Sequence, residues 1–420
     1  MSNTPQIRFA GFTDAWEQRK LSDTLDFLSN NTLSRAELSV DTGTYKNVHY
    51  GDVLIKFGEY IDAQRTDLPY IADDEKAKKF EASKLQDGDI IIADTAEDEA
   101  VGKCVEIGNI GDLSIVSGLH TIPCRPKVKF APAYLGFYLN SSSYHDQLIP
   151  LMQGIKVTSI SKSAISDTMI SAPTNLSEQG KIGQFFTRLD TLITLHQRKC
   201  DALQKFKKSM LQKMFPQNGE SVPEIRFAGF TDAWEQRKLG EVSERVKGND
   251  GRMDLPTLTI SAGSGWLDQK DRFSANIAGK EQENYTLLHK GELSYNHGNS
   301  KLAKYGAVFS LRTYEEALVP RVYHSFKVKE ADADYIEYLF ATKLPDKELG
   351  KLISSGARMD GLLNINYDDF MGIMISMPSI EEQKKISSYL RSLDNLITLH
   401  QRKLETLQKM KKSLLQKMFV

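Results

Sequence analysis

The chain spells the fifteen-residue stretch IRFAGFTDAWEQRKL twice without a change, at 7–21 and at 225–239. A second pair of related stretches, LDTLITLHQRK at 189–199 and LDNLITLHQRK at 393–403, follows the two copies. Both of these stretches lead into the same closing motif, LQKMF. Internal repeats of this kind define an architecture before any single motif does. The chain therefore consists of two halves, each with a shared head, a long divergent middle and a shared tail.

The tails predict two long helices. Ser379, followed three residues later by Glu382, fits a capping box, in which the hydroxyl caps the first turn and the carboxylate reaches back. Asn175 is an equally good cap at the equivalent place in the first tail. Apolar residues then recur at alternating spacings of four and three, which is typical of a coiled-coil seam. The seam positions are Leu189, Ile193, His196, Cys200, Leu203, Met210 and Met214 in the first tail, and Leu393, Ile397, His400, Leu404, Leu407, Leu414 and Met418 in the second.

Each helix could run about forty residues, or about 60 Å. One such helix cannot bury its row of apolar seam residues alone, and the nearest partner is its duplicate. We therefore expect an α+β protein with two globular domains separated by two long antiparallel coiled-coil helices, as a pseudo-two-fold internal repeat. The expected boundaries are 1–174 for the first domain, 175–215 for the first helix, 216–224 for the linker, 225–378 for the second domain and 379–420 for the second helix.

The divergent middles mix strand and helix patterns. Two stretches have helical spacing of their Tyr and Phe residues, at 132–149 and 333–344. The predicted strands are GDVLIKF (51–57), DIIIADT (89–95), YGAVFSL (305–311) and HSFKVKE (324–330).

Composition indicates a soluble protein, with 40% apolar and 26% charged residues. No run of eighteen apolar residues occurs, so we expect no membrane span. The first residues lack the basic and apolar regions of a signal peptide. Cys104, Cys124 and Cys200 lie far apart and are odd in number. These features favour a reduced, cytoplasmic protein.

Positive charge is concentrated in the tails, although the net charge of the chain is only −1. The segments 196–213 and 400–417 each carry six lysines and arginines against one acidic residue. Such a stripe either faces a phosphate backbone or an acidic partner, or is a solvated helix face. Composition leaves both interpretations open.

Signals for catalysis are missing from the sequence. It contains no phosphate-binding loop G-x-x-x-x-G-K-[ST], no dinucleotide motif G-x-G-x-x-G, no H-E-x-x-H or C-x-x-C, and no G-x-S-x-G. His196 and His400 occupy equivalent seam positions. A histidine in a coiled-coil seam more often sets the register of the helices than binds a metal. We expect neither a catalytic site nor a metal site.

The head and tail motifs together resemble the specificity subunit of type I restriction-modification systems. The head W-E-x-x-K-L-G-E stands at 234–241, and the first head departs from it with Ser22-Asp23. The tail P-x-x-x-E-Q-x-x-I begins at Pro378 and leads to the closing motif. The resemblance covers both halves in order. It implies that each middle is a target-recognition domain that reads one half of a split DNA sequence, while the helices set the spacer.

The resemblance also implies partners and cofactors. Two modification subunits would dock on the scaffold and methylate adenine N6 with S-adenosylmethionine. Two restriction subunits would add ATP-driven translocation and cleavage, with Mg²⁺. The specificity subunit itself binds double-stranded DNA, has no active site and holds no cofactor. The repeat then has a reason: two identical partners need equivalent surfaces, whereas two half-sites need different readers.

Candidate DNA-binding residues follow from the chemistry of groove reading, which uses bidentate polar side chains for bases and Lys, Arg, Ser and Thr for phosphates. The loops 153–159 and 354–360 share a position and a glycine but differ in side chains, and NHGNSK at 296–301 is a further candidate. The candidates are Lys46, Asn47, Lys56, Arg65, Gln153, Lys156, Thr158 and Ser159 in the first middle, and Asn296, His297, Asn299, Ser300, Lys301 and Arg358 in the second.

Candidate partner-binding residues lie in the repeated heads. They are Trp16, Arg19, Lys20, Trp234, Arg237 and Lys238. The two tryptophans have an alternative role, which is to pack each head onto its own domain.

Two other function classes remain open at this stage. The first is a helical adaptor that assembles proteins without reading DNA, which the near-zero net charge favours. The second is an enzyme with an unrecognised site in one middle. The different side chains of the paired loops favour DNA reading.

Overall fold

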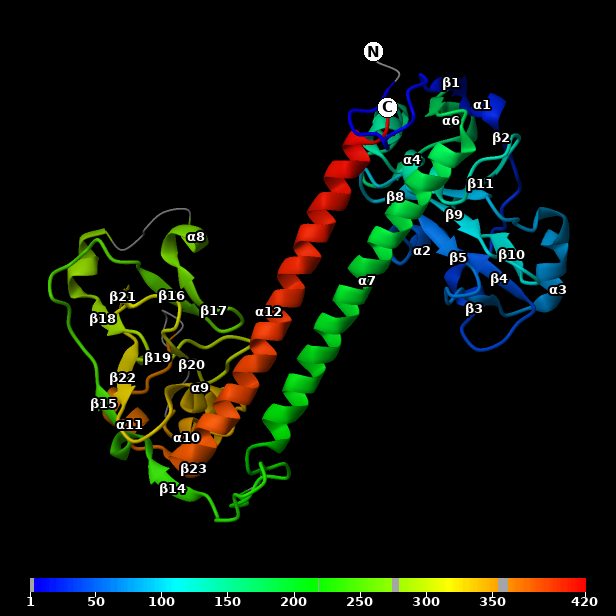
Figure 1. Ribbon diagram of the computed structural model, residues 1–420. Helices are drawn as coiled ribbons and strands as arrows, with labels where there is room; N and C mark the ends of the chain where they lie inside the picture. The colour runs from blue at the N-terminus through cyan, green and yellow to red at the C-terminus, as the bar shows by residue number, and fades with distance from the viewer. Residues whose placement is uncertain (1–3, 218, 274–278, 354–361) are drawn as a thin grey trace. The chain divides into compact units, whose positions relative to one another are not determined.

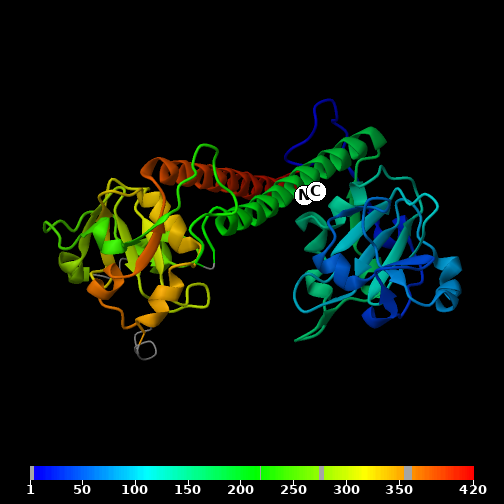
Figure 2. The same cartoon turned by 90° about the horizontal axis from the view of Figure 1, so that it is seen from below.

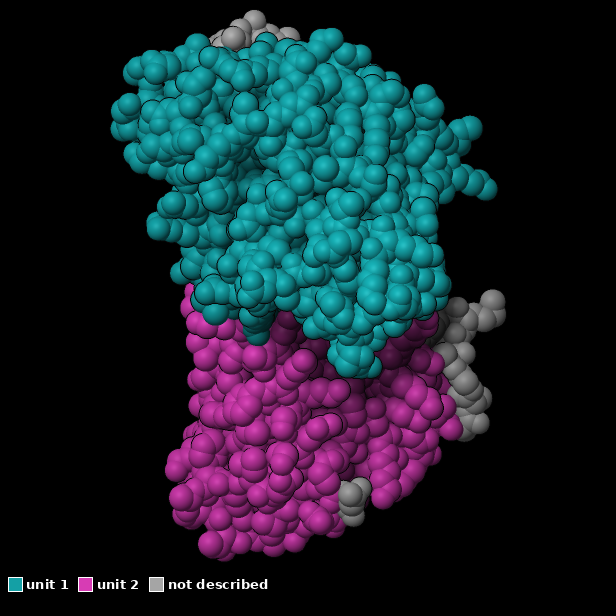
Figure 3. All heavy atoms as spheres, turned by 90° about the vertical axis from the view of Figure 1, so that its right-hand side faces the viewer, with its two compact units in different colours: residues 1–198, 401–420 teal, residues 199–400 magenta. Residues whose placement is uncertain are grey.

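The computed structural model describes residues 4–217, 219–273, 279–353 and 362–420. The chain forms two compact units. Unit 1 comprises Met1–Arg198 with Gln401–Val420, and unit 2 comprises Lys199–His400; Figure 3 colours them separately. The division falls inside both long helices, so each unit contains one globular part and one segment of each helix.

Unit 1 is a mixed α+β domain (Figure 1). Its strands are β1 (Glu17–Lys20), β2 (Leu25–Phe27), β3 (Leu38–Ser39), β4 (Tyr45–Val48), β5 (Tyr60–Asp62), β6 (Tyr70–Ile71), β7 (Ile90–Ala93), β8 (Thr95–Ala96), β9 (Cys104–Gly108), β10 (Ser114–Ser117), β11 (Thr121–Pro126), β12 (Thr158–Ser159) and β13 (Met169–Ala172). Its short helices are α1 (Leu21–Thr24), α2 (Tyr50–Ile55), α3 (Asp74–Ala77), α4 (Tyr134–Leu139), α5 (Ser142–His145) and α6 (Lys162–Ser166). One sheet has the order β2-β11-β7-β9-β5 and another the order β10-β4-β6-β3, while β1 pairs with β13 and β8 with β12.

Strand β7 lies at the centre of unit 1. Its side chains alternate between two cores, as the two-residue period of a strand requires. Ile90 and Ile92 pack in the core that contains α4, whereas Ile91 and Ala93 pack in the core that contains Val53 of α2. The predicted strand at 89–95 and the predicted helix at 132–149 are confirmed by β7, β8, α4 and α5.

The predicted strand at 51–57 is wrong, because this stretch contains α2. The His49 side chain caps the helix by accepting a hydrogen bond from the Gly51 N–H at 3.2 Å. Val53 and Phe57, four residues apart, face the core, while Ile55 is 88% exposed. In a strand, Val53 and Ile55 would have shared one face. The apolar residues of 51–57 therefore follow the period of a helix rather than that of a strand.

Unit 2 repeats the plan with different details. Its strands are β14 (Glu235–Lys238), β15 (Ser243–Arg245), β16 (Leu258–Ser261), β17 (Gly265–Asp268), β18 (Thr286–His289), β19 (Leu293–Asn296), β20 (Ala307–Ser310), β21 (Glu316–Val319), β22 (His324–Val328) and β23 (Met374–Met377). Its short helices are α8 (Gln269–Phe273), α9 (Ala333–Ala341), α10 (Asp346–Lys351) and α11 (Tyr367–Met371). The largest sheet of the described residues has the order β15-β22-β19-β20, and β14 pairs with β23 as β1 does with β13. Strands β20 and β22 and helix α9 confirm the three elements predicted for this middle.

The tails form the long helices α7 (Leu176–Lys213) and α12 (Ile380–Lys417), each of 38 residues, as predicted. In unit 1 the two run antiparallel and side by side (Figures 1 and 2): Phe186 stacks on Phe419 at 5.7 Å between ring centroids, and further along α7 Asp190 binds Lys411. In unit 2 the end of α7 and the beginning of α12 share one apolar cluster. The predicted seam is confirmed, since its residues are buried or half-buried.

Both helices begin at the predicted caps. The Asn175 side chain accepts a hydrogen bond from the Ser177 N–H at 2.9 Å, and the Ser379 hydroxyl accepts one from the Glu382 N–H at 3.4 Å. The predicted return of the Glu382 carboxylate to the cap is wrong. That carboxylate forms a bidentate ion pair with Arg226 instead, at 2.7 Å for both bonds.

The repeated heads dock against the repeated tails. Arg8 of the first head binds Glu178 at 2.6 and 2.8 Å, which is the same contact that Arg226 makes with Glu382. Both carboxylates are 1% exposed. The Ile7 N–H donates to the carbonyl that ends α12, at Lys417, and the Ile225 N–H donates to the carbonyl that ends α7, at Lys213. Each head is therefore held between one helix beginning and one helix end.

Aromatic residues close each of these docking sites. In unit 1 Phe419 packs on Trp16 and Tyr134, with ring centroids 6.3 and 5.9 Å apart. In unit 2 Phe215 packs on Trp234 and Tyr335, at 6.0 and 5.6 Å. Trp16 and Trp234 are only 1% and 3% exposed. They therefore pack each head onto its own unit, which is the alternative role considered above. The prediction that they bind a partner is wrong, because such an anchor needs an exposed ring.

Candidate nucleic-acid interface

The loop at 153–159 forms a hairpin that projects from unit 1. Gln153 and Ser159 exchange two backbone hydrogen bonds of 2.9 and 2.8 Å, and Thr158 and Ser159 pair with β8. Gly154 has φ +116°, and a Cβ there would lie 2.0 Å from the Val157 carbonyl oxygen. Only glycine fits at this turn. The structure thus gives the loop a defined shape.

The predicted reading residues of this hairpin face solvent. Gln153, Lys156 and Ser159 are exposed, and Thr158 is half-buried. Together they supply amide, ammonium and hydroxyl groups, the types that bind base edges and phosphates.

Sequence reasoning missed three residues that the sheets bring beside the hairpin. Thr95 of β8 lies opposite Ser159 and donates its hydroxyl to Asp94 at 2.7 Å. His120 lies 3.3 Å from the same Asp94 carboxylate, and the ring of Tyr50 meets the His120 ring edge-on at 5.3 Å. These residues come from three separated segments, so no local motif could have grouped them. The one available signal was that Thr95 ends a predicted strand.

In unit 2 the loop after β19 takes the place of β8. Gly298 bridges to Leu362, as β8 pairs with β12 in unit 1. Asn299, Ser300 and Lys301 are exposed there, and the Ser300 hydroxyl holds the turn by accepting from the Ala303 N–H at 3.1 Å. Arg358 and the rest of 354–360 lie outside the described residues. The bridge places Leu362 beside the loop after β19.

Three of the candidate DNA-binding residues have side chains that are buried or that hydrogen-bond within the fold. His297 is 6% exposed, and its ring nitrogens lie 2.7 Å from the Leu363 carbonyl and 2.9 Å from the Val322 carbonyl. Asn47 is completely buried on β4. Asn296 is half-buried and accepts from the Gly298 N–H at 3.0 Å, so it shapes its own turn. The predictions for His297 and Asn47 are wrong, because neither side chain can reach a groove.

The remaining candidates in unit 1 have their own local contacts. The Lys46 ammonium lies 5.0 Å from the Tyr70 ring centroid, and the Lys56 ammonium donates to the Asp67 carbonyl at 2.6 Å. The Arg65 side chain is 87% exposed. These residues come from β4, from the end of α2 and from the turn after β5, and their role in DNA binding stays a prediction.

An ion pair joins the two long helices in each unit. In unit 1 the Lys411 ammonium lies 2.6 Å from Glu59 and 2.7 Å from Asp190. Burial and the neighbouring Glu59 carboxylate raise the pKa of Asp190 to about 6. In unit 2 the equivalent pair is Lys207 with Asp394, at 2.5 Å. These pairs tie together one residue from each repeat and fix the register of the helices.

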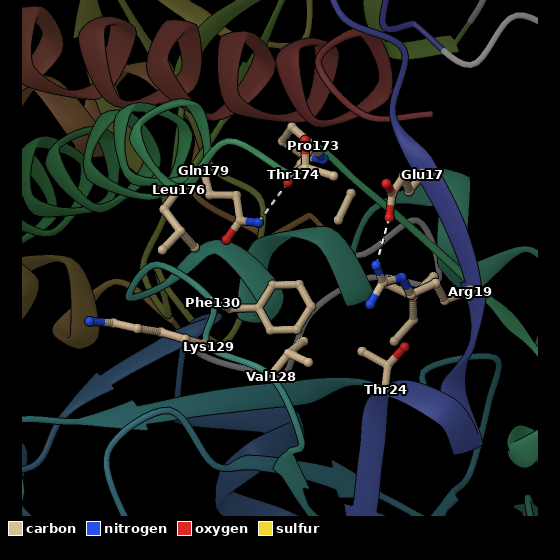
Figure 4. A pocket seen from close by; sticks show the side chains of 12 residues that line it. Glu17, Arg19, Thr24, Val128, Lys129, Phe130, Pro173, Thr174, Leu176 and Gln179 are labelled. Atoms are coloured by element: carbon tan, nitrogen blue, oxygen red, sulfur yellow. Dashed lines mark hydrogen bonds and ion pairs between the residues drawn. The ribbon is translucent and has the colours of Figure 1, made fainter.

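A pocket of about 340 Å³ lies where β1 and β13 meet the beginning of α7 (Figure 4). Arg19 donates to Glu17 at 2.7 Å on one wall, and Gln179 donates to the Pro173 carbonyl at 2.7 Å on another. Unit 2 has a pocket of about 370 Å³ at the equivalent place. Its lining includes the equivalent residues Glu235, Arg237, Pro378 and Gln383. The two units thus offer similar pockets built from repeated residues.

The other basic residues nominated in the heads are also accessible. The Lys20 side chain is 54% exposed and binds Asp167 at 2.9 Å, and Lys238 is exposed. Arg237 is half-buried near Glu241 and Glu330. Their exposure is compatible with a partner contact, which stays a prediction.

The long helices also carry exposed leucines at equivalent positions. Leu192 and Leu195 on α7 are 45% and 44% exposed, and Leu396 and Leu399 on α12 are 44% and 59% exposed. We call these four side chains the scaffold leucines. They lie outside the buried seam, and the repeat preserves them. Exposed apolar side chains that recur in both repeats are compatible with contact to a protein partner.

Within the described ranges, no group of three or more His, Cys, Asp or Glu side chains is placed to hold a metal ion. The described helices also include none that combines the length and apolarity needed to cross a bilayer. His196, at its seam position, is 7% exposed.

The family model for the type I restriction modification DNA specificity domain matches the chain twice, over 13–205 and 231–409. The chain belongs to this family. The resemblance drawn from the head and tail motifs is confirmed, and so is the fold of two α+β domains with an internal repeat and long helices. The chain is a specificity subunit, whose part in a type I restriction enzyme is DNA specificity rather than catalysis.

Relatives extend over much or all of the chain. The type I restriction enzyme MjaVIII specificity subunit of Methanocaldococcus jannaschii is 24% identical over 278 residues, which cover 63% of this chain and 64% of that protein. The putative type I restriction enzyme MjaX specificity subunit of the same organism is 23% identical over 98% of this chain and 95% of its own length. The crystal structure of the S subunit of a type I restriction-modification system from M. genitalium has a TM-score of 0.62 at 12% identity and covers 99% of both chains. That structure shares the fold.

Proposed function

We propose that this specificity subunit reads a bipartite DNA sequence, with unit 1 on one half-site and unit 2 on the other. One observation carries the proposal. The two units keep the same docking contacts between head and helices, yet the exposed loops beside β8 and after β19 carry different side chains. A duplicated framework with different exposed loops suits two different half-sites.

The side chains on these loops match the chemistry of groove reading. In unit 1, Gln153 offers an amide that can bind adenine N6 and N7, and Lys156 offers an ammonium for guanine or phosphate. In unit 2, the shorter amide of Asn299 and the ammonium of Lys301 stand on a loop of different sequence. Thr95 and Ser300 supply hydroxyls for phosphate contacts. Two short DNA-contacting loops of this kind suit a target whose two half-sites are separated by base pairs that the protein does not contact.

The scaffold would bind the catalytic subunits. The scaffold leucines and the similar pockets at Arg19 and Arg237 occur once in each repeat, so they fit two copies of one partner. These partners would be two modification subunits, which use S-adenosylmethionine to methylate adenine N6. Two restriction subunits would then add cleavage that requires ATP and Mg²⁺. The complex would act on double-stranded DNA in the cytoplasm.

Methylome sequencing tests the modular reading. The segment Gly240–Met377 is exchanged for the equivalent segment of another family member, and the methylated sequence is read in cells. One half-site should change while the other is retained, because the loops of unit 1 are untouched. An exchange that rewrites both half-sites, or a methylome that does not depend on this chain at all, would contradict the proposal. The second outcome would favour an adaptor that reads no DNA.

A further inference from the structure

The tip of the 153–159 hairpin places an apolar side chain fully in solvent. Ile155 is 100% exposed, the highest value among the exposed large apolar side chains of the described residues. Val157, two positions on, is 55% exposed. A single exposed apolar residue is common on protein surfaces. Ile155 differs because it is fully exposed on a hairpin that also exposes the polar side chains of Gln153, Lys156 and Ser159.

The position of Ile155 is set by its neighbours. The hairpin is closed at its base by the two backbone hydrogen bonds between Gln153 and Ser159. Gly154 leaves no space for a Cβ, which fixes the turn directly before Ile155. The pairing of Thr158 with Ala96 attaches the hairpin to β8. Unit 1 therefore presents Ile155 on a turn whose shape is already determined, which lowers the cost of binding.

The groups around Ile155 match one edge of the DNA major groove. Lys156 follows it directly, Gln153 precedes it by two residues, and Thr95 lies opposite Ser159. An A·T pair presents the thymine C5 methyl group beside the thymine O4 acceptor and the adenine N6 and N7 groups. An aliphatic side chain between donors and acceptors is complementary to that edge, whereas a G·C pair has no methyl group there.

We propose that Ile155 contacts the C5 methyl group of a thymine in the half-site read by unit 1 and helps to determine specificity at that base pair. The proposal rests on DNA reading by unit 1 and goes beyond it, since it assigns one side chain to one chemical group. Burial of one methyl-sized group contributes about 0.8 kcal/mol, which corresponds to about a fourfold change in affinity.

Uracil replacement in the DNA tests the contact. The full-length chain is bound to duplexes that contain the target sequence identified by methylome sequencing. In each duplex, one thymine of the unit 1 half-site is replaced by deoxyuracil. Deoxyuracil lacks the methyl group and keeps the hydrogen-bonding groups. At one position, we expect the wild-type chain to bind the uracil duplex about fourfold more weakly than the thymine duplex. The Ile155→Ala variant should bind the two duplexes equally.

Two further variants serve as controls. Leu302 is an exposed aliphatic residue beside Lys301 in unit 2, with 71% exposure. Leu302→Ala should leave the uracil effect in the unit 1 half-site unchanged. Ile155→Val, which removes one carbon, should retain part of the effect. Because Ile155 makes no buried contact, all these variants should fold.

The outcomes separate this inference from the proposed function. Specific binding of the target without any uracil effect, or an effect that survives in Ile155→Ala, overturns the methyl contact and leaves DNA reading intact. Equal weakening of all duplexes by Ile155→Ala, including one of random sequence, also overturns it. Absence of specific DNA binding by the wild-type chain refutes both.

Discussion

Phe419 lies one residue from the end of the chain, yet it packs in the core of the N-terminal domain. It is 4% exposed, and its ring centroid lies 5.7 Å from both Tyr138 and Phe186, in addition to its contacts with Trp16 and Tyr134. We predict that Phe419→Ala strongly destabilises unit 1. Truncation of a buried Phe to Ala costs about 3–5 kcal/mol, through lost burial and the cavity that remains.

The magnitude can be expressed as a melting temperature. For a unit of about 200 residues, each kcal/mol lowers the midpoint by about 2–4 °C, so the midpoint should fall by roughly 6–20 °C. Scanning calorimetry of the full chain measures this change. Hydrogen exchange then assigns it to a unit, because amides of β7 report on unit 1 and amides of β22 report on unit 2. Exchange should accelerate at β7.

Phe215→Ala is the matched control, because Phe215 occupies the equivalent place in unit 2. It is fully buried against Trp234 and Tyr335. This variant should accelerate exchange at β22 by a similar amount. A Phe419→Ala midpoint within about 2 °C of the wild type, or faster exchange confined to unit 2, would refute the assignment of the chain's end to unit 1.

Three further predictions concern the scaffold. Arg8→Ala leaves the buried Glu178 carboxylate without its partner and should cost about 3–5 kcal/mol by denaturant unfolding, whereas Arg8→Lys should recover part of it. Leu407→Asp places a charge in the seam, where Leu407 is 9% exposed, and should destabilise the chain by several kcal/mol; an unchanged melting temperature would mean that the seam is not packed. The pKa of Asp190 is raised to about 6 by burial and by Glu59, so the folded chain binds this proton more tightly than the unfolded chain does. The resulting stability is present below about pH 4 and is lost as the pH rises through about 6. Asp190→Asn should therefore flatten the fall in melting temperature between those values, and a fall as steep as that of the wild type would contradict this cause.

The two long helices were predictable because they depend on short-range sequence patterns that occur in both halves of the chain. The caps at Asn175 and Ser379, the seam positions and the helix lengths all follow from short-range spacing. What the spacing could not give was the partner of Glu382. The capping box is a local rule, whereas the ion pair with Arg226 joins residues 156 positions apart. A long-range contact displaced the local one because Arg226 offers a charged, bidentate donor.

The reading surface was predictable only in part, for the same reason. The 153–159 loop could be nominated because its glycine and polar residues are contiguous. Thr95, His120 and Tyr50 could not be grouped, since the pairing of β8 with β12 and the packing of α2 bring them together. His297 and Asn47 have side chains suitable for DNA contact, but burial decides against both. Residue type indicates what a side chain can do, and the fold determines what it can reach.

The spacer between half-sites offers a test of the scaffold as a whole. The division between the units falls at Arg198–Lys199 in α7 and at His400–Gln401 in α12. Four residues inserted at both places add about one turn, or about 6 Å, to each helix. All contacts within each unit, including the ion pairs at Asp190 and Asp394, lie on one side of these points and are kept.

The double insertion should therefore leave both half-sites unchanged and lengthen the spacer by about two base pairs, at about 3.4 Å each. An insertion in α7 alone gives the two helices unequal lengths between the units, so one helix must bend or loop out, and methylation should fall sharply at every spacer length. Methylome sequencing distinguishes these results. A single insertion that changes the spacer as cleanly as the double insertion would show that the helices do not act as a pair, and a double insertion that alters a half-site would show that the loops depend on more than their own unit.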